Sequence, residues 1–198
     1  MRHVKRVIMN KDNSHIDIEN NIKGLQSNND KIRGKHFKII YPLSDSNPEL
    51  LYPYWDIFIE MLYRPEVSNK YYAIHLITKI VKVDFDKRFN EIFNYWFNDL
   101  LNYESPVVSH HIAEKSGMIV KARPDLENKI TSLLLNIEKT SKCRHIDLQK
   151  AYILSAFDIY FDIVFDKRKV IEFIKAQQEN PSPKTKKKAK ELIEKYNI

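Results

Sequence analysis

Glycine is scarce in this sequence, which contains only 3 glycines among 198 residues. A sheet protein of this length normally uses more glycine in the tight turns between its strands. Apolar residues nevertheless make up 43% of the chain, which is enough to bury a continuous core and to exclude global disorder. The composition therefore favours helices joined by polar or proline-containing turns, in one domain or one short repeat array.

Cysteine and long apolar runs are also lacking. The one cysteine, Cys143, excludes an internal disulfide and a multi-cysteine metal site. No apolar run approaches the roughly 18 residues of a membrane span. The basic residues that follow Met1 are not succeeded by the apolar core of a secretory signal. We therefore expect a cytoplasmic protein that does not enter a membrane.

The positive charge is unevenly distributed along the chain. The formal net charge is +7, and the segment 181–198 carries six lysines and two glutamates, a net +4. The other 180 residues therefore carry only +3. The high isoelectric point belongs largely to the C-terminal segment, which weakens the case for an extended nucleic-acid-binding surface.

Small residues recur at an almost constant interval, which indicates an internal repeat. They are spaced by 39, 40, 38 and 38 residues and comprise Gly34, Ala73, Ala113, Ala151 and Ala189. Four positions before each stands a residue type that caps helix N-termini, namely Asp30, Asn69, Ser109, Asp147 and Thr185. A small residue lets a neighbouring helix pack at about 8–10 Å, so each site is expected to lie on the second helix of a helix pair and to admit its hairpin partner.

Apolar stripes at helical spacing precede these sites and predict the first helix of each pair, as at Ile92, Phe93, Trp96 and Phe97. Aspartates at positions 45, 84, 125 and 166 are expected where one helix ends and the next begins. The pattern predicts an all-α fold, a right-handed α-α superhelix of about five helix pairs. We expect residues 1–14 to form an N-terminal extension or partial helix and residues 15–198 to form a single array. Its repeats are approximately 15–44, 48–84, 86–122, 125–164 and 166–198.

The segments 102–113 and 180–189 carry a family resemblance. Each combines asparagine, proline, a small polar residue and an alanine, with a basic residue three positions before that alanine. They resemble the turn and inner-helix start of HEAT repeats. The basic position is occupied by Lys31, Lys70, His110 and Lys186, whereas Leu148 departs from it. The resemblance covers roughly residues 15–198 and implies an α-solenoid that binds partners on its surface, without indicating which partner.

Residue types that carry catalysis are present, but not in a catalytic arrangement. The basic neighbours of Cys143 would lower a thiol pKa, although a cysteine in a turn between helices is the simpler interpretation. His36 and His75 share one repeat position, and stacked repeats would bring them together, but no carboxylate or cysteine stands at a matching spacing. We therefore expect no catalytic residue, no cofactor and no metal site.

The leading functional hypothesis is a non-catalytic scaffold that binds a protein partner on a concave face formed by the second helices. That face is predicted to be mildly basic, so an acidic protein segment is the natural ligand class. The candidate partner-binding residues are Lys35, His36, His75, Lys79, His111, Lys115, Lys186, Lys187 and Lys188.

Two alternatives stay open. One is a nucleic-acid-binding module, or an alkylated-DNA repair module similar to HEAT-like glycosylases, because Trp55 with Asp56 and Trp96 with Asp99 loosely match their tryptophan and acid. Against it stand the charge of +3 outside the tail and the expectation that both tryptophans lie in the core. The other is a structural part of a larger assembly, in which the lysine-rich helix 183–196 is a solubilising cap.

Overall fold

The computed structural model describes residues 7–9 and 15–198, with side chains from residue 16 onward. Within these residues, regular structure is helical apart from an antiparallel ribbon of β1 (Val7–Met9) and β2 (His15–Asp17). The all-α class is therefore confirmed. Of the expected extension 1–14, the structure describes only β1, which is a strand, and the rest lies outside the described residues.

The chain divides into two compact units, residues 1–83 and 84–198. The first unit contains α1 (Ile18–Leu25), α2 (Asp30–Ser46), α3 (Trp55–Tyr63) and α4 (Val67–Ile80). Short 3-10 turns connect or extend them at η1 (Pro48–Leu50), η2 (Tyr52–Tyr54) and η3 (Val81–Val83). Helix α1 packs on α2, α3 packs on α4, and the second helices α2 and α4 pack on each other.

The second unit follows the same plan. Its first helices are α5 (Phe89–Asn94), continued by the π-helix η4 (Tyr95–Leu100), then α7 (Glu127–Leu135) with α8 (Ile137–Thr140), and α10 (Lys167–Ala176). Its second helices are α6 (Pro106–Ala122), α9 (Ile146–Tyr160) and α11 (Pro183–Tyr196). The turns are η5 (Pro124–Leu126), η6 (Phe161–Ile163) and η7 (Gln177–Glu179).

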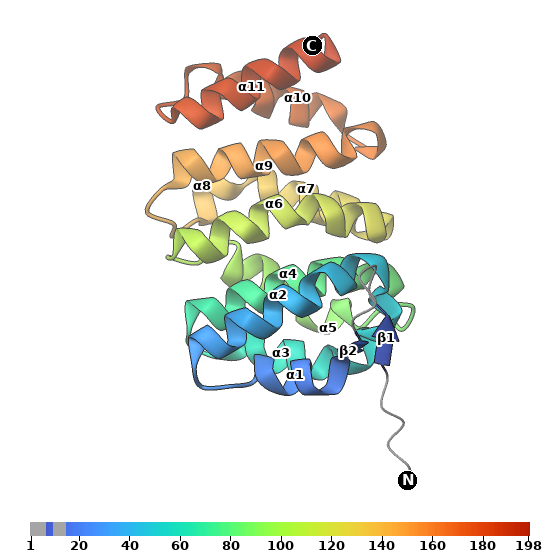
Figure 1. The fold of residues 1–198 in the computed structure, drawn as a ribbon. Helices are drawn as coiled ribbons and strands as arrows, with labels where there is room; N and C mark the ends of the chain where they lie inside the picture. The colour runs from blue at the N-terminus through green and yellow to red at the C-terminus, as the bar shows by residue number, and fades with distance from the viewer. Residues whose placement is uncertain (1–6, 10–14) are drawn as a thin grey trace. The chain divides into compact units, whose positions relative to one another are not determined.

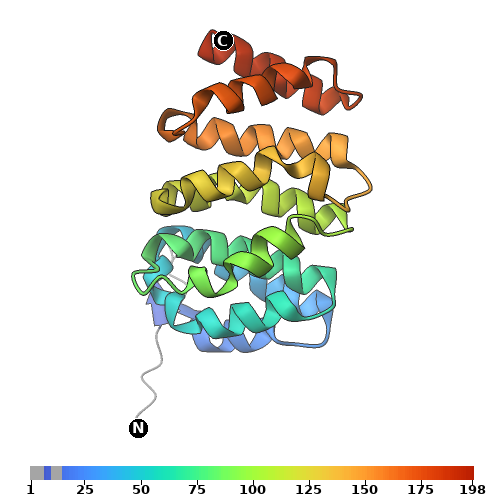
Figure 2. The ribbon, with the colours of Figure 1, turned by 180° about the vertical axis from the view of Figure 1, so that it is seen from behind.

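Helices α6, α9 and α11 form one layer of the second unit, which we call the inner layer. Helix α9 packs against both α6 and α11, and the three lie one above another in Figure 1. The view from behind in Figure 2 brings α7 and α10 to the front. Each inner helix begins at the same edge of the layer, because the first helix of every pair returns the chain to that edge.

The small-residue register marks close contacts in the core. Ala73, Ala113, Ala151 and Ala189 are fully buried. A Cβ on Gly34 would lie 3.1 Å from the Tyr72 hydroxyl of α4. Gly34 therefore faces the next second helix rather than its hairpin partner α1, which corrects our expectation for that site. Tight packing occurs between successive second helices as well as within pairs.

The polar residues of the register are not N-caps, so that prediction was wrong. The N-cap positions are occupied instead by Asn29, Glu66, Ser105, His145 and Ser182. The predicted residues lie in the first helical turn, where Ser109 and Thr185 are fully buried. Their short polar side chains suit this place because they bond to nearby carbonyl oxygens, as when Ser109 Oγ donates to Ser105 O at 3.2 Å.

Two of the predicted aspartates do start helices. Asp84 accepts hydrogen bonds from the main-chain N–H groups of Arg88 and Phe89, both at 2.8 Å. Asp166 is the N-cap of α10 and accepts from Lys169 N at 3.4 Å. Asp125 also lies where the sequence predicted, in η5 between the end of α6 and the start of α7, whereas Asp45 lies in the last turn of α2.

Candidate partner-binding faces

The predicted partner-binding residues of the first unit are mostly engaged in its own structure. His75 is 7% exposed, and its ring centroid lies 4.4 Å from Tyr71 and 5.6 Å from Tyr41. Lys79 Nζ donates to Asp45 Oδ1 at 2.8 Å. His36 Nδ1 lies 2.9 Å from Asn21 Oδ1. Of the four predicted here, only Lys35 is exposed.

The rings of His36 and His75 lie in different surroundings. The ring of His36 covers Gly24, where a Cβ would lie 2.0 Å from His36 Cδ2. The ring of His75 is enclosed by aromatic side chains of α2 and α4. No group of three or more metal-ligating side chains exists among the residues that the structure describes.

On α6, the two predicted cations share one carboxylate. His111 Nδ1 lies 3.8 Å from Glu114 Oε2, and Lys115 Nζ lies 3.3 Å from the same oxygen. The His111 imidazole and the Lys115 ammonium together lower the pKa of Glu114 to about 2. Glu114 therefore stays ionised and offsets much of the positive charge that the sequence predicted for this part of the face.

The three lysines predicted on α11 are also partly balanced. Lys186 pairs with Glu179 at 3.2 Å and Lys188 with Asp158 at 2.9 Å. Lys187 lies 4.0 Å from Glu191, and its side chain is 81% exposed. An exposed pair at that distance is weak, so Lys187 keeps most of its charge available to a partner.

A basic groove lies between α9 and α11. Its volume is about 210 Å³, and its lining residues are Ala151, Ser155, Lys184, Lys187, Lys188 and Glu191. Three ammonium groups thus border the groove, against one carboxylate. Ala151 leaves room at the floor because it is the small residue of its repeat.

Lys184 extends this groove toward α6 through a stack of side chains. Its Nζ lies 3.8 Å from the centroid of the Tyr152 ring, close enough for a cation–π contact. Tyr152 in turn stacks on His110, with centroids 4.7 Å apart. His110, Tyr152 and Lys184 come from the three inner helices, so they form a continuous strip across the inner layer.

Sequence reasoning missed Lys184 and Tyr152 as members of this face. Lys184 was counted only as part of the tail charge, and Tyr152 carried no signal beyond its place beside Ala151. Projecting the register onto successive parallel helices would have brought the two close together, because one opens α11 and the other lies in the second turn of α9.

Cys143 lies in the turn between α8 and α9, as the simpler of the two interpretations of the sequence predicted. It is 7% exposed, and its Sγ lies 3.6 Å from His110 Nε2. Burial lowers the pKa of His110 to about 4, so the imidazole is neutral at pH 7. A neutral imidazole does not supply the imidazolium that activates a nucleophilic cysteine.

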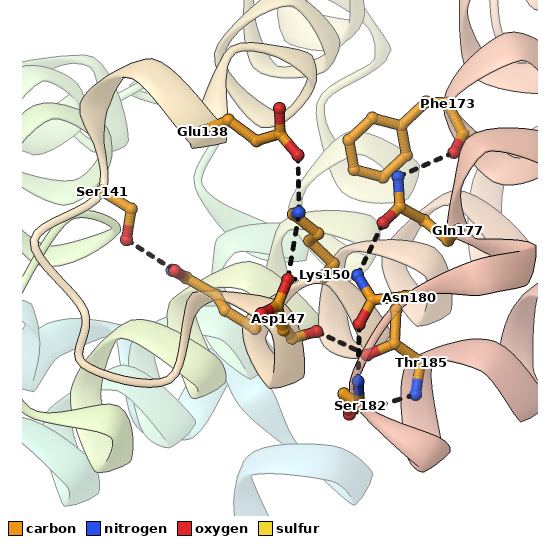
Figure 3. A network of polar contacts seen from close by, with 10 residues as sticks. Glu138, Ser141, Asp147, Lys150, Phe173, Gln177, Asn180, Ser182 and Thr185 are labelled. Atoms are coloured by element: carbon orange, nitrogen blue, oxygen red, sulfur yellow. Dashed lines mark hydrogen bonds and ion pairs between the residues drawn. The ribbon is translucent and has the colours of Figure 1, made fainter.

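Figure 3 shows a polar network that joins the first turns of α9 and α11. Lys150, 7% exposed, donates from Nζ to Glu138 Oε1 at 2.5 Å and to Asp147 Oδ1 at 3.3 Å. Asn180 Nδ2 also donates to Asp147 Oδ1 at 3.3 Å. The Lys150 ammonium is buried and paired with carboxylates of the same protein. Lys150 therefore stabilises the packing of α9 against its neighbours and is not part of a binding face.

The basic register position serves the structure in the first unit too. Lys70 is 3% exposed, and its Nζ donates to the carbonyl oxygens of Leu62 and Arg64 at 3.0 and 2.5 Å. These carbonyls lie at the C-terminal end of α3, where a cation also favours the helix dipole. The basic residue that resembles the HEAT pattern thus holds one helix of its pair against the other.

The tryptophans and the aspartates of the DNA-repair alternative differ in their exposure to solvent. Trp55 and Trp96 are 1% and 0% exposed, as expected of core residues. Asp56 and Asp99 are exposed. Neither indole is available to stack on an extruded base, whereas such stacking is how enzymes that act on bases hold them.

Comparison with family models, with curated proteins and with solved structures finds no match for this chain. The resemblance to HEAT repeats therefore stays a prediction. Among the described helices, none is long and apolar enough to cross a membrane.

Proposed function

We propose that this protein is a non-catalytic scaffold of HEAT-like repeats that binds an acidic segment of a partner protein. The binding face is the inner layer of the second unit, and the groove between α9 and α11 is its centre. The observation that carries the proposal is that Lys184 and Lys187 converge on that groove, beside Lys188, which is paired with Asp158. A right-handed superhelical arrangement of the repeats and a cytosolic location belong to the same proposal.

The strip of side chains suits an acidic peptide better than a uniformly charged surface would. Carboxylates of the partner meet the lysine ammonium groups, and the Tyr152 ring offers apolar surface beside them. Charge complementarity of this kind gives specificity and fast association more than high affinity. The engaged residues on α6 and in the first unit would contribute little, because each already has a carboxylate, amide or aromatic partner within the protein.

Fluorescence anisotropy of a labelled peptide rich in Asp and Glu tests this proposal. The double variant Lys184→Ala/Lys187→Ala should weaken binding about tenfold, equivalent to about 1.4 kcal/mol. The matched control is Lys139→Ala/Lys175→Ala, which removes the same charge from exposed lysines of α8 and α10, outside the inner layer and the groove. The control should bind nearly as well as the parent protein.

Two results would contradict the proposal. Equal weakening by both double variants would mean that only net charge matters. Tighter binding of labelled duplex DNA than of the acidic peptide, lost in Lys184→Ala/Lys187→Ala, would favour the nucleic-acid alternative.

A further inference from the structure

A second cavity lies on a first helix of the second unit, and the proposed scaffold function does not use it. Its volume is about 330 Å³, and it is lined by Tyr95, Asn98, Asp99, Asn102, Tyr103 and Lys142. That volume is near the lower end of the roughly 300–1,000 Å³ typical of small-molecule sites. Most of its lining comes from one helix and the turn after it, and Lys142 comes from the turn between α8 and α9.

The cavity coincides with the π-helix η4. Leu101 N donates to Trp96 O at 3.0 Å, five residues back rather than four. A π-turn inserts one extra residue into a helix and is found frequently at functional sites. Along η4, Asn98 and Asp99 are exposed and Tyr95 is half-buried, while Trp96 lies in the core.

Asn102 fixes the wall of the cavity. Its Nδ2 donates to Asn98 O at 2.9 Å, and its Oδ1 accepts from Thr140 Oγ1 at 2.9 Å. Its main-chain carbonyl accepts from Lys142 N at 3.2 Å. These bonds tie the end of the π-helix to the loop that carries Lys142, so the two sides of the cavity are held together before any ligand binds.

Opposite charges line the cavity without neutralising each other. Asp99 and Lys142 are both exposed, and neither forms an ion pair with another residue in the described part of the chain. An aspartate and a lysine in one pocket are complementary to a ligand that carries one ammonium and one carboxylate. Tyr95 and Tyr103 add aromatic surface for an apolar group.

We propose that this cavity binds a small zwitterion of the α-amino acid class. The ligand ammonium pairs with Asp99, the ligand carboxylate pairs with Lys142, and the ligand side chain lies against the tyrosine rings. The volume suits a free amino acid rather than a folded partner. The site is independent of the basic groove, since it shares no lining residue with it.

Isothermal titration calorimetry with phenylalanine and two analogues tests the charge requirement. Phenylalaninamide lacks the carboxylate, and 3-phenylpropionate lacks the ammonium. Phenylalanine should bind saturably, and each analogue should bind at least about tenfold more weakly, which corresponds to the loss of one charge-assisted contact. Both variants should lose the preference for the zwitterion. Asp99→Asn should bind 3-phenylpropionate as well as it binds phenylalanine, and Lys142→Met should bind phenylalaninamide as well as it binds phenylalanine.

Glu91→Gln and Lys139→Met are the matched controls, because they remove the same charges from exposed residues outside the cavity and should leave binding unchanged. Lys142 lies in an exposed turn, so Lys142→Met carries the test even where Asp99→Asn fails to fold. Equal affinity for all three compounds would overturn the proposal. So would no binding of phenylalanine, or tighter binding of a neutral sugar such as glucose.

Discussion

The hydroxyl of Thr185 donates a 2.5 Å hydrogen bond to the main-chain carbonyl of Asp147. The two residues occupy the same register position in successive repeats, so this bond joins the first turn of α11 to the first turn of α9. A position that looked like a helix cap in the sequence therefore links neighbouring inner helices. The bond is part of the network that also holds Asn180 and Lys150.

Replacing Thr185 by valine should test this link. Valine has nearly the same shape, so it removes the hydroxyl and leaves the packing. We expect Thr185→Val to lower the free energy of unfolding by about 1 kcal/mol in urea denaturation. Thr185→Ser keeps the hydroxyl and should lose less. A valine variant as stable as the parent would show that the bond contributes nothing.

Gly117 should tolerate no side chain, although it is not a member of the register. A Cβ there would lie 2.7 Å from the Ala156 carbonyl oxygen and 3.0 Å from Ala156 Cα, both main-chain atoms of α9. Alanine is favoured over glycine inside a helix by about 1 kcal/mol, yet Gly117→Ala should destabilise the protein by about 1–3 kcal/mol. Thermal and urea unfolding both measure this.

Gly34→Ala is the matched control for that prediction. Its new Cβ would meet only the hydroxyl end of Tyr72, at 3.1 Å, and a side-chain end moves more easily than a helix backbone. We expect Gly34→Ala to stay within about 1 kcal/mol of the parent. If Gly117→Ala were as stable as Gly34→Ala, the contact of α6 with α9 would be looser than the structure shows.

Ala113 extends the same argument to the register itself. It is fully buried, so Ala113→Leu should overpack the core of the second unit and cost about 1–3 kcal/mol. Urea denaturation of this variant measures the effect. A leucine variant as stable as the parent would mean that the register does not select small residues for packing.

His110 should make stability depend on pH. Burial lowers its pKa from 6.5 to about 4 in the folded protein, while the unfolded chain keeps the ordinary value. Between these values the unfolded state binds more protons, so stability falls as the pH drops from about 6.5 to about 4 and then levels off. The full effect is at most about 3 kcal/mol.

Urea denaturation across that pH range measures the slope, and NMR titration of the imidazole measures the pKa directly. His110→Gln should flatten the slope, because it removes the buried imidazole whose protonation the folded state opposes. A measured pKa for His110 near 6.5 would mean that the imidazole reaches solvent.

The helical class and the approximate position of each second helix could be predicted from the sequence. Each second helix has one closely packed position that accepts only a small side chain. This requirement places Ala73, Ala113, Ala151 and Ala189 at a nearly constant spacing, and the spacing can be seen in the sequence. Helix starts could not be predicted in the same way. Ser109 and Thr185 have the chemistry of a cap, but the same chemistry serves buried bonds to carbonyl oxygens inside the first turn.

The candidate site was harder to predict than the fold. Charge counting identified Lys186 and Lys188, but their carboxylate partners Glu179 and Asp158 come from other elements. The contacts of Tyr152 with His110 and Lys184, and the π-helix η4, likewise could be identified only in the folded structure. Composition records how many charges a chain has, whereas a site depends on which of them remain without a neighbour of opposite sign.

The DNA-repair alternative predicts release of alkylated bases, whereas the scaffold proposal predicts none. We expect no release of base from alkylated duplex DNA above the spontaneous rate, because Trp55 and Trp96 are buried. Release that disappeared in Asp56→Asn or Asp99→Asn would contradict the scaffold proposal. An Asp99→Asn effect on phenylalanine binding alone would leave it intact.

The most direct test of the scaffold proposal is to map where an acidic peptide binds. In a two-dimensional NMR titration with a peptide rich in Asp and Glu, the amide signals of Tyr152, Ser155, Lys184 and Lys187 should shift together and saturate. Signals of α7 and α10 should not move. Shifts on those first helices, or no shift along α9 and α11 at concentrations where anisotropy shows binding, would contradict the assignment of the inner layer as the partner-binding face.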